Sequence, residues 1–273
     1  LVEARVRPVR LSNKQRNYRE NWWLHANRVE GAGPYSRQHG RLIGLSQASK
    51  HMAFGFVPSG TIAANTMIVF LLHRDSDFAM LQSRIHEEWV RLVGSSLEDR
   101  LRYITPCFDT FPRPRLQDDG TLESTGAQYY EWRSTFMLRN ESGLTETYNR
   151  FHDPEESSPE IVKLRELHAA MDKAVLEAYG WHDLAASATC EYLLDYEEDE
   201  DDEESTGRRR KKPWRYRWAD DFRDEVLSRL LELNRQRAEE ERLAGLAADG
   251  SGKKAKGVKK SAKADSNQQE LFG

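Results

Sequence analysis

The spacing of apolar residues changes along this chain, and that change constrains the fold more than any other feature of the sequence. In the first third, aliphatic and aromatic residues gather in short runs of strand length, at residues 41–45, 52–57 and 67–72. The last of these runs is continuously apolar, which is typical of a central strand covered on both faces. We therefore expect a sheet in the first half of the chain.

Apolar residues recur at intervals of three and four elsewhere, which indicates amphipathic helices. One such helix is expected from about residue 78 to 93, ended by Gly94. Pro159 begins a second helix that ends at Gly180, and a third runs from about 218 to 246. The last two are expected to pack together. The predicted fold class is α+β, a mixed sheet with flanking helices followed by a helical C-terminal module.

Two further segments complete the expected order of elements. Ser12 can cap a helix over residues 13–24 that carries Trp22 on its inner side. Residues 111–159 contain bulky aromatic side chains but show no clean period, so no element is assigned there. Residues 247–273 are mostly Gly, Ala, Ser and Lys, and they are expected to form a disordered basic tail.

Charge is distributed unevenly along the chain. Residues 1–50 carry ten Lys or Arg against three acids, the sign of charge that a phosphate backbone attracts. Eight consecutive carboxylates occupy residues 197–204, and five basic residues follow at 208–212. Such a block is expected to be a solvated, disordered insertion. The predicted domains are a DNA-binding domain at 1–115 and a helical module at 116–246 that contains the insertion at 197–212.

Several classes of protein are excluded by what the sequence lacks. No apolar run approaches the roughly 18 residues of a membrane span, so we expect a soluble intracellular protein with no membrane partner. Cys107 and Cys190 are too few for a disulfide framework or a four-ligand zinc site, and are expected to be ordinary buried thiols. Because the chain begins with Leu1 and not Met, it is expected to be processed or to be a segment of a longer protein.

The motifs of familiar enzymes are absent or incomplete. The zinc-protease pattern H-E-x-x-H begins at His86, but Val90 stands where the second histidine is required. No nucleophile elbow, Walker phosphate loop or zinc quartet occurs. A methyltransferase acting on an extruded adenine needs a glycine-rich cofactor turn and a Pro-Pro pair beside an aromatic residue, and this chain has no Pro-Pro dipeptide. We therefore predict no catalytic residue, no metal site and no methyl transfer by this chain alone.

Candidate DNA contacts come mainly from the basic N-terminal half. Guanidinium groups suit phosphates, which predicts such contacts for Arg16, Arg19, Arg28 and Arg37. Specificity is expected from a few side chains near Arg41, Ser49, Lys50 and His51. Ser49, Lys50 and His51 lie in a polar loop whose side chains suit base edges, although a plain connecting hairpin fits the pattern equally well. Arg84 completes the predicted DNA-binding set. For the N-terminal helix, the alternative is that Trp22 and Trp23 anchor it to the sheet while its arginines are solvated.

Several short motifs follow one another between residues 8 and 246. They are Trp22-Trp23, Ser49-Lys50-His51 ahead of residues 54–58, residues 81–89, Tyr103 with residues 108–114, residues 167–181, and residues 216–218 with 223–227 and 233–234. In this order they resemble the C-terminal target-recognition region of fused adenine-N6 DNA methyltransferases. That group includes MmeI-like type IIL restriction-modification enzymes and phage-defence methylases. The order of the motifs carries the resemblance, and no single motif decides it.

The resemblance implies a role in choosing a DNA sequence. In that family an upstream domain binds S-adenosylmethionine and methylates adenine, while the recognition domain reads the site from the major groove. Residues 1–115 would be the target-recognition domain, with no cofactor in this chain and S-adenosylmethionine in the parent enzyme. The expected partners are double-stranded DNA and a methyltransferase catalytic domain, in the same polypeptide or a partner subunit, in the bacterial cytoplasm. The alternative is a protein-interaction adaptor of a defence complex.

Overall fold

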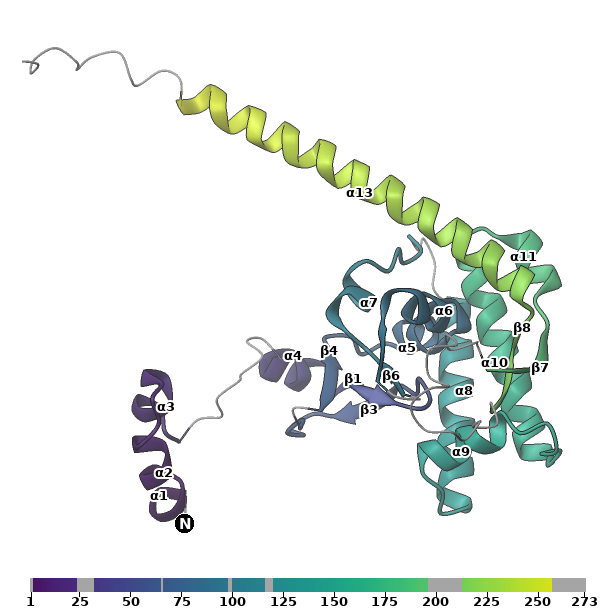
Figure 1. Cartoon of the computed structure of the whole chain (residues 1–273), viewed down its shortest axis with the longest axis horizontal. Coiled ribbons are helices and arrows are strands. Elements are labelled where there is room, and N and C mark those ends of the chain that lie inside the picture. The colour runs from purple at the N-terminus through teal and green to yellow at the C-terminus, as the bar shows by residue number, and fades with distance from the viewer. Residues whose placement is uncertain are drawn as a thin grey trace, which may run out of the picture.

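The computed structural model describes residues 2–23, 32–64, 66–97, 100–115, 120–195 and 213–256 (Figure 1). Its strands are β1 (Arg41–Ser46), β2 (Ala48–Ser49), β3 (Gly55–Pro58), β4 (Met67–Phe70), β5 (Ser95–Leu97), β6 (Arg100–Arg102), β7 (Cys190–Leu194) and β8 (Trp214–Trp218). Its helices are α1 (Val2–Arg5), α2 (Arg7–Leu11), α3 (Arg16–Glu20), α4 (Ala32–His39), α5 (Asp75–Gln82), α6 (Arg84–Val93), α7 (Thr105–Asp109), α8 (Gly120–Arg139), α9 (Leu144–Phe151), α10 (Pro159–Ala178), α11 (His182–Ser187) and α13 (Asp220–Lys256).

The described strands form three small antiparallel sheets, in the orders β3-β1-β4, β2-β6-β5 and β7-β8. β1 lies in the middle of the first sheet and buries its aliphatic side chains. β4 lies at the edge of that sheet, and its Met67 is 38% exposed. The prediction of a central strand at residues 67–72 is therefore wrong, because only Phe70 of β4 is fully buried. Sheets with helices packed against them confirm the α+β class.

The single helix predicted over residues 78–93 is two helices. Ser83, between α5 and α6, has an extended backbone with φ −66° and ψ 155°. Its hydroxyl oxygen accepts a hydrogen bond from the backbone N–H of His86 and donates one to the carbonyl of Met80. One residue therefore ends α5 and caps α6. Leu92, which continues the spacing of the buried residues Leu81, Ile85 and Trp89, is 49% exposed.

α8 has no counterpart in the prediction from sequence. Its buried positions follow a repeat of four and three residues that is typical of a packed helix: they are Leu122, Gly126, Tyr129, Arg133 and Phe136. A glycine and an arginine occupy two of these positions, which hides the repeat from a search for apolar residues. Gly126 allows α8 to approach α5 closely, because a Cβ atom there would lie 2.1 Å from the carbonyl oxygen of Asp75.

One hydrophobic cluster joins the first and second halves of the described chain. α8 and α10 pack on each other and on α5, and α13 packs on α6. The most extensive helix contact of α13 in the described part of the chain is thus with α6, in the first half, whereas the sequence predicted packing on α10. The cluster continues across residue 115, where a domain boundary is predicted from the sequence. The two sequence regions share one core in the described part of the chain.

The two ends of the chain depart from the predicted elements. The helix predicted over residues 13–24 is replaced by α2 and α3, separated by a turn. α13 continues to Lys256, past the predicted end at residue 246, and Figure 1 shows its far part extending away from the main body. The predicted insertion at 197–212 and the tail after Lys256 lie outside the described residues. Among the described helices, none has the length and apolar character needed to cross a membrane.

Candidate nucleic-acid interface

The first predicted phosphate contacts lie on α3, within the group α1–α3 that Figure 1 shows apart from the main body. The Arg16 side chain is 79% exposed and pairs with Glu20 at 2.8 Å, an i,i+4 pair on the helix surface. Arg19 donates hydrogen bonds to the carbonyls of Asn13 and Lys14, each at 2.8 Å. Both guanidinium groups are near the surface. Arg28 lies outside the described residues.

The tryptophans of this N-terminal group contact one another. The rings of Trp22 and Trp23 meet edge to face with centroids 5.7 Å apart. The Arg7 guanidinium lies over the Trp22 ring at 5.4 Å, and Trp23 is 56% exposed. These contacts stay within residues 2–23. The alternative in which the two tryptophans anchor the segment to the sheet is therefore not the arrangement of the described structure.

Arg37 and Arg41 lie at the start of the main body. Arg37 is exposed on α4. Arg41, the first residue of β1, is fixed by a hydrogen bond from Nη2 to Asp75 at 2.6 Å and one from Nε to the carbonyl of His73 at 2.9 Å. Its guanidinium carbon also lies 3.7 Å from the centroid of the Phe56 ring. Arg41 therefore joins β1 to α5, with 37% of its side chain still exposed.

β6 brings two arginines, Arg100 and Arg102, beside the polar loop of Ser49, Lys50 and His51, and neither arginine belongs to the predicted DNA-binding set. β2 pairs with β6 so that Ala48 lies opposite Arg102 and Ser49 lies opposite Leu101. Residues directly opposite each other share a face of the sheet, and Leu101 packs against the core. Ser49, half-buried, therefore shares the inner face. Arg100 and Arg102 are exposed on the outer face.

We call Ala48, Arg100 and Arg102 the hairpin surface. Polar and apolar residues alternate from Arg100 to Tyr103, and this pattern in the sequence could have revealed the hairpin surface. Arg100 and Arg102 are exposed, Leu101 is half-buried and Tyr103 is buried. Alternation with a period of two is typical of a strand with one buried face. The strand is only three residues long, which leaves such a pattern too short to stand out in the sequence.

Lys50 and His51, which follow β2, are tied to the second half of the chain. Lys50 Nζ donates to Asn149 Oδ1 at 2.9 Å. His51 is buried, with Nε2 2.9 Å from the same oxygen and Nδ1 2.8 Å from Nη1 of Arg215. Burial, together with the charges of Arg215 and Lys50, lowers the pKa of His51 to about 4. Both ring nitrogens are occupied, so the base contact predicted for His51 is not available in this arrangement.

Arg84 is buried at the start of α6, with 3% of the residue exposed. Its Nη1 donates to Asp172 Oδ2 and lies 2.7 Å from His168 Nδ1, and its backbone N–H donates to Asp172 Oδ1 at 2.8 Å. Burial alone would raise the pKa of Asp172, but His168 and Arg84 together hold it below its usual range. A buried, paired guanidinium cannot reach a phosphate. The predicted DNA contact by Arg84 is therefore wrong, and Arg84 joins α6 to α10.

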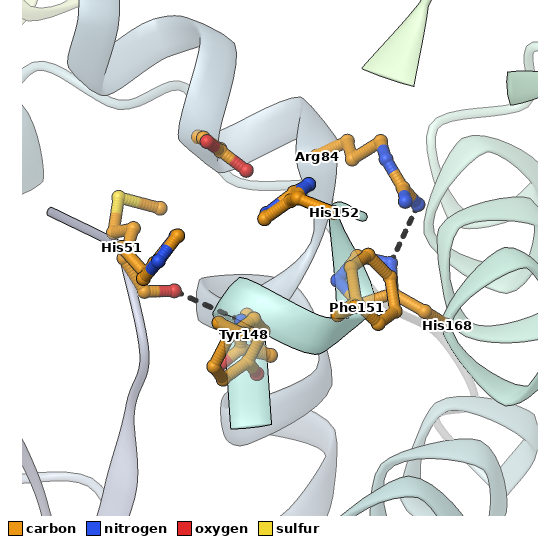
Figure 2. Close-up of a pocket in the computed structure, with 9 residues that line it drawn as sticks. His51, Arg84, Tyr148, Phe151, His152 and His168 are labelled. Atoms are coloured by element: carbon orange, nitrogen blue, oxygen red, sulfur yellow. Dashed lines mark hydrogen bonds between the residues drawn. The ribbon is translucent and has the colours of Figure 1, made fainter. Parts of the chain in front are cut away.

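A small polar cavity lies between the contacts of His51 and those of Arg84. Figure 2 shows histidines from both halves of the chain around it. Its polar lining includes His51, Arg84, Glu87, His152 and His168. Burial lowers the pKa of His152 and of His168, so these rings are neutral near pH 7. Within the described residues, no group of three His, Cys, Asp or Glu side chains is placed to hold a metal ion. The cavity therefore lies at the interface between the first and second halves of the chain.

Comparisons with known proteins agree with the resemblance seen in the motifs. Residues 3–115 match a family model described as MmeI, target recognition domain. Over 132 residues the chain is 30% identical to DNA methyltransferase A of Bacillus subtilis (strain 168), covering 45% of this chain and 14% of that protein. The predicted resemblance to the recognition regions of DNA methyltransferases is thereby confirmed, with the family match confined to residues 3–115.

The fold is also similar to a solved structure. That structure is the type IIL restriction-modification enzyme MmeI in complex with DNA, with a TM-score of 0.50 and 23% sequence identity. The likeness covers 64% of this chain and 23% of that chain, so it extends beyond residues 3–115 into the helical half. This chain matches less than a quarter of the length of either relative.

Proposed function

We propose that this chain is the DNA sequence-recognition portion of a site-specific adenine-N6 DNA methyltransferase, in a type IIL restriction-modification or related phage-defence system. The match of residues 3–115 to the MmeI target recognition domain supports the proposal. The structural observation that carries it is the hairpin surface, where Arg100 and Arg102 are exposed on a strand that packs against the core through Leu101.

The spacing of these two arginines suits a DNA groove. Residues i and i+2 on one face of a strand lie about 7 Å apart, and two base-pair steps rise about 7 Å along the DNA helix axis. Arg100 and Arg102 can therefore contact positions two steps apart. The major groove admits a two-stranded β-ribbon, and arginine forms paired hydrogen bonds with O6 and N7 of guanine. We assign base reading to Arg100 and Arg102.

Phosphate contacts are assigned to arginines outside the hairpin surface. Arg16, Arg19 and Arg37 carry guanidinium groups at or near the surface of α3 and α4, and Arg41 retains partial exposure. Arg28 is also assigned to phosphate contacts, because it belongs to the basic N-terminal half of the sequence. Contacts of this kind supply affinity that depends strongly on salt and little on base sequence.

Methyl transfer would take place on a catalytic domain outside residues 1–273, in the same polypeptide or in a partner subunit. That domain would hold S-adenosylmethionine, which supplies the methyl group, and no residue of this chain is assigned to the cofactor. The role of this chain would be to bring the catalytic domain to one DNA sequence. The matched relatives, whose own lengths far exceed the match, support such a division of labour in the parent enzyme.

Substitutions on the hairpin surface and on α3 should have different effects on DNA binding. Arg100→Ala or Arg102→Ala should reduce discrimination between a preferred duplex and its scrambled counterpart by about 1–3 kcal/mol, because a paired contact to a base edge is lost. Arg16→Ala with Arg19→Ala should weaken binding to both duplexes alike and lower the salt slope by about one per lost contact. Fluorescence anisotropy over a series of salt concentrations measures both quantities.

Arg139→Ala is the matched control for these variants. Arg139 is exposed at the end of α8, so its loss removes the same charge from the second half of the chain. It should leave discrimination unchanged. Equal discrimination by wild type, Arg100→Ala and Arg102→Ala would show that the bases are not read by the hairpin surface.

The adaptor alternative draws support from α13. This helix extends away from the main body in Figure 1, and its Leu243 is 53% exposed. A chain that acted only as an adaptor would bind neither duplex above the level expected from its charge. The same anisotropy measurement on the wild-type chain therefore separates the two functions.

A further inference from the structure

We propose that Asn149 and Arg215, which lie in the helical half of the chain, are positioning residues that set the placement of the hairpin surface and thereby its discrimination between DNA sequences. The inference rests on the proposed function, because discrimination is the property that it explains. It assigns to the second half of the chain a part in reading DNA that the family match over residues 3–115 does not contain.

Both residues hold the segment that directly follows β2. Asn149 Oδ1 accepts hydrogen bonds from Lys50 Nζ and His51 Nε2, each at 2.9 Å. Arg215 Nη1 donates to His51 Nδ1 at 2.8 Å, and Nη2 donates to the carbonyl of Lys50 at 3.3 Å. The partners are far apart in sequence, 98 residues between His51 and Asn149 and 164 between His51 and Arg215. The fold therefore fixes the end of β2 through elements outside its own sheet.

The hydrogen-bond chemistry makes this link directional. A guanidinium group only donates, so His51 Nδ1 accepts from Arg215 and the ring proton must lie on Nε2. That proton is donated to Asn149 Oδ1. Arg215 therefore bonds to Nδ1 of His51 and Asn149 bonds to Nε2, and one neutral tautomer of the ring makes both hydrogen bonds. A side chain without an acceptor at position 149 leaves the Nε2–H of His51 and the Nζ of Lys50 without this partner.

Arg215 is itself fixed from the opposite side. Its Nε donates to Asp195 Oδ2 at 2.8 Å, and the residue is only 5% exposed. The His51 ring also stacks on the ring of His152, with centroids 5.3 Å apart. Arg215 and His51 are buried and cannot touch DNA themselves. Their influence on DNA has to pass through the position of the backbone at Lys50.

The hydrogen-bonded pairing of β2 with β6 couples the backbone position at Lys50 to the hairpin surface. β2 is only two residues long, with Ala48 opposite Arg102 and Ser49 opposite Leu101. The ladder is extended by a hydrogen bond from the Tyr103 N–H to the carbonyl of Gln47 at 2.9 Å. A strand this short has few hydrogen bonds of its own to fix its place. A shift at Lys50 therefore moves Arg102, and hydrogen bonds to base edges weaken steeply when their geometry changes.

The test uses the full 273-residue chain and two DNA probes. One probe is the duplex that the wild-type chain enriches from a pool with randomised central positions, and the other is the same duplex with those positions scrambled. The variants are Asn149→Ala, which removes the acceptor, and Asn149→Asp, which keeps it. Asn140→Ala is the matched control, because Asn140 is also exposed and, within the described residues, its side chain bonds to the carbonyl of Phe136 in the preceding helix α8. Kd for both probes and the thermal midpoint are measured for each variant.

We expect Asn149→Ala to keep the wild-type Kd for the scrambled duplex and to raise the Kd for the enriched duplex about tenfold, the equivalent of one lost hydrogen bond. Asn149→Asp should restore most of the discrimination, and Asn140→Ala should behave as wild type. Amide hydrogen exchange over residues 48–52 should increase in Asn149→Ala, with the thermal midpoint near that of the wild type.

Two results would overturn the inference, and they are distinguishable from failure of the proposed function. If wild type discriminates and Asn149→Ala discriminates equally well, Asn149 does not position the hairpin surface. If Asn149→Ala weakens binding to both duplexes by the same factor, its effect is on general binding and the positioning role is also wrong. If wild type itself shows no discrimination, the proposed function fails, and the positioning role with it.

Discussion

Arg84→Ala is expected to lower the free energy of unfolding by about 3–5 kcal/mol, the usual cost of removing one partner of a buried ion pair. Asp172, 1% exposed, would keep its charge with no guanidinium to oppose it. The carbonyl of Tyr216 would also lose a donor. Urea or guanidinium unfolding followed by near-ultraviolet circular dichroism measures the loss. A large part of the stability of this chain should therefore depend on a residue that the sequence suggested for DNA binding.

Two further variants test whether the cost comes from the unpaired charge. Arg84→Ala combined with Asp172→Asn removes both charges and keeps an acceptor for the backbone N–H at residue 84, so the double variant should be more stable than Arg84→Ala alone. Arg229→Ala breaks exposed pairs with Asp183 and Glu225 and should cost much less than Arg84→Ala, because exposed ion pairs stabilise a fold only slightly. If Arg84→Ala costs no more than Arg229→Ala, the α6–α10 link does not stabilise the fold.

Acidification from pH 7 to pH 4 is expected to destabilise the chain before most of its carboxylates titrate. Burial lowers the pKa of His51 and of His86 from 6.5 to about 4. Between these values the unfolded chain binds protons that the folded chain does not, so the free energy of unfolding falls as the pH falls. Each histidine accounts for roughly 3 kcal/mol over this window. His152 and His168, with pKa lowered in the same direction, add to the effect.

The pH window separates the histidines from the carboxylates. Glu156, whose pKa is held at about 2 by the hydrogen bond from Arg150, loses its contribution only below its ordinary pKa of 4.5. Denaturant unfolding at a series of pH values between 7 and 5 measures the histidine part, because ordinary carboxylates titrate below this range. The His51→Gln, His86→Gln double variant should show a shallower dependence. A free energy of unfolding that stays flat from pH 7 to pH 5 would contradict the neutral, buried state of these rings.

Parts of the fold follow from local pattern, and the exceptions have physical causes. The strand at β1 and the start of α10 at Pro159 could be predicted, because a dense aliphatic run and an N-terminal proline act through neighbouring residues. The break at Ser83 could not, because a serine inside an apolar helical pattern becomes a cap only where tertiary packing divides the helix. α8 could not be predicted either, because one of its buried positions is Arg133, which bonds to the carbonyl of Phe54 and lies over the ring of Tyr148, both from other elements.

For the candidate site too, the features set by neighbouring residues could be predicted and those set by partners distant in sequence could not. The sequence pointed to the loop that contains Ser49, Lys50 and His51, which lies beside the hairpin surface in the structure. It did not show that His51 is buried, since its partners Asn149 and Arg215 are distant in sequence. Arg84 was mistaken for a surface residue for the same reason, because Asp172 lies 88 residues away. A charged residue can be placed on the surface only when its partner is known.

The most direct test of whether this chain selects a DNA sequence is selection by the wild-type chain from a pool of duplexes with randomised central positions. Recovered duplexes are sequenced, and Kd is then measured for the enriched duplex and its scrambled counterpart at several salt concentrations. We predict enrichment of one short motif, with binding about 10³-fold or more tighter than to the scrambled duplex, and a loss of affinity for both as salt increases. A recovered pool as random as the starting pool, or no binding to either duplex, would contradict the claim.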